Sequence, residues 1–356
     1  MKTEYKYMVA TYSFTYNQSL YIDEALRGFA MQKTSFPVVY IIVDDASTDG
    51  EQSIIKKWAS ANLISSKDEE LWKKKPYGEL AISRLMKNDH LTFIIYLLNE
   101  NHYQQGRNMF VYISDWLKCS KYCATCEGDD YWIDPLKLEK QVAKMESDDK
   151  ISLCHTCFEI LDLKSNTLIK YNDTRVLEIQ ENSPEKISSY ILALNRYFIS
   201  FPTVMYRLSS YKKVHPLLKT DYIFLMSDTQ KHACLASIGK TAYISDVTTV
   251  YRNIPGSVSH QTDPRKNMEF ELSAAAMRAY YSRILEIDDN LKKKLNLLYM
   301  RAIIIYKVSF NPFYVPEVPV YYYSWIQKLV FRGISSKLSA VIISITLKAI
   351  GKKLLI

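Results

Sequence analysis

The sequence has little glycine and little proline, with 9 and 11 of these residues among 356. It is 48% hydrophobic, which excludes a collagen-like or disordered chain and provides enough apolar side chains for a folded core. It also lacks the run of about 18–20 apolar residues that a membrane-spanning helix needs. The best candidate, 340–350, is shorter and contains Ser344 and Lys348. We therefore expect no transmembrane segment.

No export signal is recognisable near the first residue. The apolar run 7–10 is too short for the central part of a signal peptide. We therefore expect a cytoplasmic protein whose six cysteines are reduced thiols. Lys and Arg exceed Asp and Glu by 46 to 38, a net charge of +8. This mild excess fits phosphate-bearing ligands or an anionic membrane surface, and is too diffuse to indicate nucleic acid.

The first 130 residues alternate between strand-like and helical patterns. The apolar, strand-like segments are 7–11, 38–43, 92–98 and 121–126. Segment 22–30 between them has the spacing of an amphipathic helix, and the charged segment 61–90 is predicted to be an irregular insertion. This order predicts an α/β fold with a doubly wound, mostly parallel sheet. In such sheets ligands bind beyond the carboxyl ends of the strands.

Helix starts follow each of the two acidic segments of this half. Thr48 is expected to cap a helix, with Glu51 three residues later completing a capping box. Asp134 is expected to cap the next helix, which would begin at Pro135. From about residue 268 onward the pattern is helical, which predicts a helical extension after the α/β part.

Two groups of acidic residues follow predicted strands at the binding edge. Adjacent carboxylates such as Asp129 and Asp130 raise each other's pKa, and a bound divalent cation removes that penalty. Mn²⁺ and Mg²⁺ prefer carboxylate oxygens together with ligand phosphates, so this turn, which begins at Glu127, predicts a metal–diphosphate site. An acidic turn before a helix is the alternative. Asp44 and Asp45 could accept hydrogen bonds from a nucleobase or a ribose. The alternative is that they are part of a solvated loop.

Three motifs follow one another over residues 1–145: Thr-Tyr-Asn at 15–17, Val-Asp-Asp-Ala-Ser-Thr-Asp-Gly at 43–50, and Glu-Gly-Asp-Asp-Tyr-Trp at 127–132. In order and spacing they resemble the nucleotide-sugar domain of glycosyltransferase family 2, which has the GT-A fold. Ser227-Asp228, Gly239-Lys240 and 250–252 resemble the acceptor half of that family, so the resemblance covers about 1–260.

The resemblance implies an inverting transfer of a sugar from a nucleoside diphosphate sugar to a hydroxyl acceptor. The acceptor class would be a cell-surface polysaccharide or a lipid-linked glycan. Residues 1–130 would then bind the donor, 131–260 would bind the acceptor and supply the catalytic base, and 261–356 would form the helical extension.

The resemblance also implies a role for individual residues. The metal, Mn²⁺ or Mg²⁺, would be held by Asp130 together with Asp129 and Glu127. The nucleoside would be bound by Thr11 or Thr15, Tyr16, Asn17, Asp44 and Asp45. Asp228 would be the general base, and Arg252 would lie near the diphosphate. His260 is a candidate stand-in for the polar residue that the family often has where this chain has Asn253.

Several of these residues have a structural alternative. Asp228 falls in Ser227-Asp228-Thr229-Gln230, a capping-box pattern, and His260 is also typical of a plain loop histidine. Cys123/Cys126 and Cys154/Cys157 have the spacing of zinc ligands, but each pair lies in a strand-like run, which favours buried core thiols. The alternative functions are a nucleotidyltransferase, although 11–19 has no glycine, or a zinc-stapled basic binding module.

The end of the chain is basic and amphipathic. Residues 318–356 contain Lys and Arg but no Asp or Glu, and apolar residues recur there at helical spacing. Such a helix suits the surface of an anionic bilayer, or packs on the core of its own protein. If 320–356 binds a membrane, the enzyme is peripheral on the inner face of the cell membrane and a lipid-linked acceptor is the natural substrate.

Overall fold

The computed structural model describes residues 5–65, 70–171, 184–193, 199–219, 224–285, 287–311, 313–316 and 318–319. The chain divides into two compact units. The first consists of Met1–Glu181, Ile199–Pro216 and Ile238–Asn253, and the second of Asn182–Phe198, Leu217–Ser237 and Ile254–Ile356. The three-part division expected from the sequence stays a prediction.

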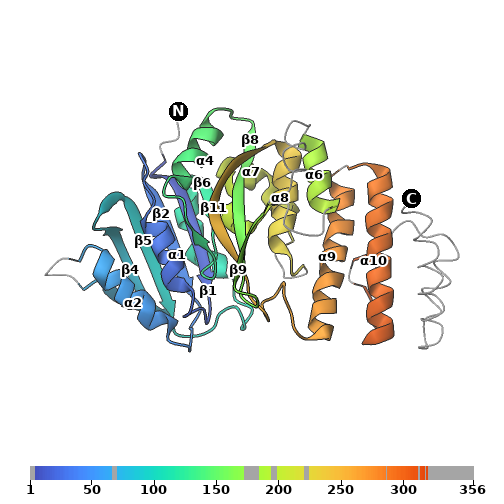
Figure 1. Cartoon of the computed structure of the whole chain (residues 1–356), viewed down its shortest axis with the longest axis horizontal. Coiled ribbons are helices and arrows are strands. Elements are labelled where there is room, and N and C mark those ends of the chain that lie inside the picture. The colour runs from blue at the N-terminus through green and yellow to red at the C-terminus, as the bar shows by residue number, and fades with distance from the viewer. Residues whose placement is uncertain are drawn as a thin grey trace. The chain divides into compact units, whose positions relative to one another are not determined.

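A mixed sheet of eleven described strands forms the first unit (Figure 1). The strands are β1 (Tyr7–Thr15), β2 (Val38–Asp44), β3 (Trp72–Lys75), β4 (Gly78–Leu85), β5 (Asn88–Leu98), β6 (Ser120–Thr125), β7 (Tyr131–Trp132), β8 (Ile151–Asp162), β9 (Thr167–Lys170), β10 (Met205–Arg207) and β11 (Lys240–Asn253). Their order is β3-β4-β5-β2-β1-β6-β10-β8-β11-β7, and β9 pairs with β8.

The strands that carry the predicted motifs are parallel neighbours. β1 pairs in parallel with β2 and β6, and β2 pairs in parallel with β5. Thr15 lies opposite Asp44 in this register, so the carboxyl ends of β1 and β2 meet at one edge. The predicted α/β fold with parallel central strands is confirmed, and antiparallel strands extend the sheet on both sides.

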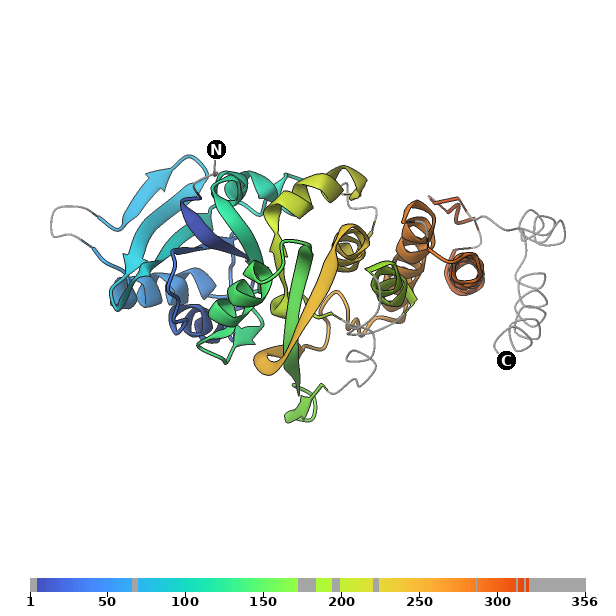
Figure 2. The ribbon, with the colours of Figure 1, turned by 90° about the horizontal axis from the view of Figure 1, so that it is seen from above.

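Helices cover both faces of this sheet. One face packs against α1 (Ile22–Ala30), α2 (Glu51–Asn62) and α4 (Lys137–Glu146), whose apolar residues share one core with alternate residues of β1, β2, β5 and β6. The other face carries the 3₁₀ turn η1 (Met109–Tyr112), α3 (Ser114–Lys118) and α7 (Leu208–Val214). Figure 2 shows α1 and α2 on one side of the first unit's strands and α7 on the other.

Three predicted boundaries in the first unit are wrong. Segment 61–90 is not an irregular insertion: β3 and β4 form a hairpin there, because Ala81 and Leu85 on alternate positions of β4 are buried against the core. β5 begins at Asn88 rather than at residue 92. α4 begins at Lys137, and Asp134 instead accepts a hydrogen bond from the Leu136 N–H at 2.9 Å.

The described part of the second unit is helical. It contains α6 (Pro184–Ala193), α8 (Ser227–Ile238), α9 (Pro264–Ile284) and α10 (Asp289–Ser309). α9 and α10 are each capped by an aspartate, Asp263 and Asp288, and pack against each other, which confirms the predicted helical pattern there. The tail 320–356 lies outside the described residues. None of the described helices is both long enough and apolar enough to span a membrane.

Candidate active site

An acidic turn directly after β6 forms the centre of the site. One carboxylate oxygen each of Glu127, Asp129 and Asp130 lie within 4.8 Å of one another, the one such carboxylate, histidine or cysteine group in the described part of the chain. Glu127 is exposed, Asp129 is half-buried and Asp130 is buried. Burial raises the pKa of Asp129 and of Asp130, and the charge of Asp129 raises the pKa of Asp130 further. A cation bound to these oxygens would relieve both penalties, and three carboxylates are a suitable donor set for Mn²⁺ or Mg²⁺.

Gly128 brings this turn against the loop that follows β1. A Cβ atom at Gly128 would lie 2.5 Å from Gln18 Oε1 and 2.7 Å from Thr15 Oγ1. A larger residue would force these side chains to move. The first and third sequence motifs, more than 100 residues apart, therefore lie side by side at the carboxyl edge.

We expect Gly128→Ala to lower metal-dependent donor affinity at least tenfold and to destabilise the protein by about 1–3 kcal/mol, since a core overfilled by one methyl costs that much. Calorimetric titration and thermal melting measure the two effects. Gln18→Ala in the same chain should restore part of the affinity because it removes the nearer of the two contacts. Wild-type affinity of Gly128→Ala alone would show that the turn tolerates a shift.

Arg252 holds the acidic turn from the end of β11. Its N–H donates to Asp130 Oδ1 at 2.8 Å, and its guanidinium donates to the Asp129 carbonyl oxygen at 2.5 Å. The guanidinium also forms an ion pair with Glu24 of α1. It lies over the rings of Tyr131 and Tyr21, 4.4 and 5.1 Å from their centroids. Arg252 therefore fixes the backbone and carboxylate of the turn, and its predicted contact with the diphosphate stays a prediction.

Glu51 joins the loops that follow β1 and β2. Its buried carboxylate accepts hydrogen bonds from the Gln18 N–H at 2.7 Å, from Ser47 Oγ at 2.9 Å and from Thr15 Oγ1. The predicted capping box is thus wrong: α2 has Gly50 as its N-cap, without a side-chain cap. Glu51 faces the loop because three donors meet it there. Burial raises the pKa of Glu51.

The acidic pair after β2 is buried, and its two members differ. Asp45 accepts from the His102 N–H at 2.7 Å and from the Tyr103 N–H at 2.9 Å, so it anchors the loop after β5. Asp44 Oδ1 accepts from the Ser47 N–H at 3.1 Å and from Gln52 Nε2 at 2.5 Å. Asp44 Oδ2 is buried without a hydrogen-bond partner, and burial raises the pKa of Asp44. Neither side chain is a solvated loop residue.

The loop 99–108 was not identified from the sequence. His102 Nε2 lies 2.9 Å from Arg107 Nη1, and its Nδ1 lies 2.9 Å from the Tyr112 hydroxyl. Because arginine can only donate, Nε2 accepts, and the hydrogen of a neutral His102 is on Nδ1. Arg107 also pairs with Glu100 at 3.2 Å. The sequence does hold a signal for this loop: a polar run that directly follows the buried strand 92–98. Both acidic groups also directly follow predicted strands.

The remaining predicted nucleoside residues lie on β1 and its loop. Thr15 is at the end of the strand beside the acidic turn, whereas Thr11 is buried in mid-strand opposite Tyr40. Which of the two threonines lines the nucleoside pocket stays a prediction. Asn17 has a positive φ of 54° and accepts from the Thr48 N–H at 2.8 Å, which ties this loop to the next one. Tyr16 is exposed.

Asp228 and His260 belong to the second unit. Asp228 lies in the first turn of α8, half-buried, and its Oδ1 accepts from the Thr229 N–H at 2.8 Å. In the capping-box pattern, the Gln230 side chain accepts from the Lys219 N–H at 3.1 Å and from the Tyr281 hydroxyl. His260 lies between β11 and α9, in a turn where its carbonyl oxygen accepts from the Gly256 N–H at 2.8 Å.

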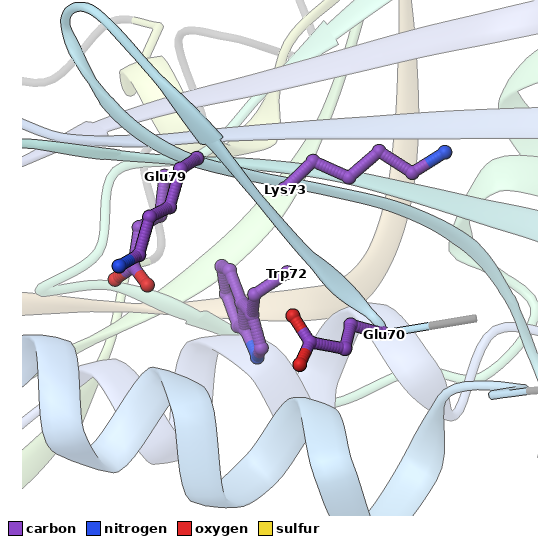
Figure 3. Close-up of a pocket in the computed structure, with 5 residues that line it drawn as sticks. Glu70, Trp72, Lys73 and Glu79 are labelled. Carbon is purple, nitrogen blue, oxygen red and sulfur yellow. The ribbon is translucent and has the colours of Figure 1, made fainter. Parts of the chain in front are cut away.

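Cys126 directly precedes the acidic turn, whereas one surface hollow lies away from it. Five of the six thiols are buried, as expected for core thiols, and Cys119 is half-buried. The hollow, of about 520 Å³, opens on the hairpin β3–β4 and is lined by Glu70, Trp72, Lys73, Lys74 and Glu79 (Figure 3). β4, β5, β2 and β1 separate β3 from β6, so this hollow is not part of the acidic site.

Comparison with known proteins gives sequence relatives without an assigned function. No family model matches the chain. Uncharacterized proteins of Mycobacterium tuberculosis and Mycobacterium bovis are 30% identical over 263 residues, which is 72% of this chain and 62% of each relative. The chain thus spans about three fifths of the length of these relatives.

Solved structures identify the fold. TarS of S. aureus, residues 1–349, is 14% identical with a TM-score of 0.50, covering 87% of this chain and 75% of that one. Its complex with UDP-GlcNAc is 15% identical with a TM-score of 0.51, covering 85% and 73%. At such identity the likeness establishes the fold alone. The parallel core, the acidic turn at its carboxyl edge and this likeness together show that the chain has the fold of the GT-A glycosyltransferases.

Proposed function

We propose that the protein is a metal-dependent, inverting glycosyltransferase that moves a sugar from a nucleoside diphosphate sugar to a hydroxyl acceptor. The observation that carries this proposal is the group of three carboxylates at the carboxyl edge of a GT-A sheet. A diphosphate and a divalent cation together match its charge and its oxygen ligands. The acceptor class we propose is a cell-surface polysaccharide or a lipid-linked glycan.

The nucleoside would bind at the ends of β1 and β2. Thr15, Tyr16 and Asn17 lie on one loop, and Asp45 anchors the neighbouring loop that carries His102. Glu51 and Asn17 cross-link the loops after β1 and β2, so their hydrogen-bonding groups are held in place before a ligand arrives. Such preorganisation lowers the entropic cost of binding. Because TarS has been solved with UDP-GlcNAc, uridine donors are the first to test.

Glu127, Asp129 and Asp130 would hold Mn²⁺ or Mg²⁺ at the diphosphate. The bound cation would neutralise the charge that develops on the leaving group. Arg252 keeps Asp130 in position through its own N–H and fixes the Asp129 backbone through its guanidinium. Ligand oxygens held in this way need little rearrangement during the reaction.

Asp228 would accept the proton of the acceptor hydroxyl. Inversion requires attack from the face opposite the leaving group, so the base must belong to the acceptor side. Asp228 is half-buried in the first turn of α8, and the Gln230 side chain of the capping-box pattern binds Lys219 and Tyr281. His260 is proposed to lie near the substrates on the loop that follows Arg252.

The test is calorimetric binding of UDP, GDP, dTDP and CDP, each with Mn²⁺ and again with EDTA. We expect one of them to bind only with the metal. The nucleotidyltransferase alternative requires a nucleoside triphosphate and release of pyrophosphate, so product analysis separates it. A zinc-stapled module would keep zinc through dialysis and bind none of the four.

The basic tail supports a proposed location on the inner face of the cell membrane. It lies outside the described residues, so its lysines and its apolar spacing are the only support. We expect a chain that ends at Pro319 to lose co-sedimentation with anionic liposomes, and the full chain to be released by high salt. Equal co-sedimentation of both chains would contradict a membrane-binding tail.

A further inference from the structure

Glu24 links α1 to the acidic turn, although it belongs to none of the three motifs. Its side chain is 53% exposed, yet it forms an ion pair with the guanidinium of Arg252, whose side chain is only 2% exposed. Glu24 and Arg252 are 228 residues apart in sequence. A guanidinium this deeply buried needs a carboxylate partner, because an unpaired buried charge is costly.

Two further hydrogen bonds of Arg252 reach the acidic turn. Its guanidinium donates to the Asp129 carbonyl oxygen, and its N–H donates to Asp130 Oδ1. The rings of Tyr21 and Tyr131 flank it and restrict its orientation. Glu24 supplies the carboxylate that forms an ion pair with this guanidinium.

We propose that Glu24 is a positioning residue for the metal–diphosphate site, a proposal that rests on the proposed function. Glu24 neutralises Arg252 and orients its guanidinium toward the Asp129 backbone. The charge of Arg252 also acts on the carboxylates of Asp129 and Asp130, so without Glu24 these carboxylates can attract the guanidinium. Arg252 then competes with the cation for these carboxylates, and the affinity of the site for the metal falls.

The experiment measures Mn²⁺ affinity of full-length variants, in the presence of whichever of UDP, GDP, dTDP and CDP the wild type binds. Glu24→Ala should weaken Mn²⁺ binding about 10–100-fold, the range seen when a partner of a metal ligand is removed. Glu24→Gln keeps a hydrogen-bond acceptor without the charge, so its Mn²⁺ affinity should lie between those of the wild type and Glu24→Ala. Asp23→Ala is the matched control, because Asp23 is the neighbouring acid of α1 and pairs with the exposed Arg27. Asp23→Ala should bind Mn²⁺ as the wild type does.

The outcomes separate this proposal from the proposed function. A wild type that binds Mn²⁺ with none of the four nucleotides overturns the proposed function. A wild type that binds, with Glu24→Ala binding equally well, overturns the positioning role of Glu24 alone. In EDTA, where no nucleotide is expected to bind, Glu24→Gln and the wild type should melt at the same temperature; a loss of Mn²⁺ affinity seen only where the variant is partly unfolded would mean a general structural role and would also overturn it. If Glu24→Ala does not fold, Glu24→Gln decides. It is then compared with the wild type, with each protein held equally far below its own melting temperature.

Discussion

Replacing Asp130 by alanine is expected to abolish Mn²⁺-dependent donor binding, with a loss of at least 100-fold in affinity. Asp130 is the buried member of the carboxylate group, and Arg252 fixes one of its oxygens. Removal of a directly bound carboxylate costs more than the 10–100-fold typical of a residue one shell further out. Calorimetric titration of the nucleoside diphosphate with Mn²⁺ and with EDTA measures the effect.

Asp130→Asn separates loss of metal binding from loss of fold. Asparagine keeps an oxygen that can accept from the Arg252 N–H, but it removes the ionisable carboxyl group, whose pKa is raised by burial. A raised pKa means that the native state holds this proton more tightly than the unfolded state, so the destabilisation from Asp130 grows as the pH rises through the native pKa. In EDTA, Asp130→Asn should therefore melt above the wild type at pH 7.5, and by less at pH 5.

Asp115→Asn provides the control for both measurements. Asp115 is an exposed aspartate of α3 that pairs with Lys118, so its loss changes the net charge by the same amount. It should leave donor affinity unchanged. If Asp130→Ala binds the donor with unchanged Mn²⁺-dependent affinity, the assignment of Asp130 as a metal ligand is wrong.

Asp228→Asn is expected to lower kcat by about 10²–10⁴, the usual contribution of a general base, while donor affinity stays at the wild-type value. The carboxylate lies in the first turn of α8, where asparagine is also tolerated and can still accept from the Thr229 N–H. The substitution therefore removes the proton acceptor and keeps the local structure. Turnover with the acceptor and calorimetry with the donor separate the two effects.

Asp263→Asn is the matched control for this substitution. Asp263 caps α9 in the same unit, with its Oδ1 accepting from the Arg265 N–H at 2.8 Å. It should change neither kcat nor donor affinity. Wild-type turnover of Asp228→Asn would leave Asp228 as a plain first-turn residue and would require another base.

Much of the fold was predictable because its signals are local. The fully apolar run 38–43 and the helical spacing of 22–30 each need only neighbouring residues, and β2 and α1 are found there. Segment 61–90 was misread because β3, its first strand, lies at the edge of the sheet. Edge strands carry charged residues, such as the three lysines of β3, which conceal the alternation.

The sequence by itself determined the four parallel strands β1, β2, β5 and β6, the burial of most thiols and the place of both acidic groups at strand ends. These follow from periodicity and from the rule that strands of a parallel sheet end at one edge. The partner of each polar side chain was decided by the tertiary structure. From the sequence, Glu51 could complete a helix cap or bind a neighbouring loop. In the structure its carboxylate accepts hydrogen bonds from three donors in the loops after β1 and β2. Likewise, only the path of the chain brings Glu24 to Arg252, because a contact across 228 residues leaves no periodic trace in either segment.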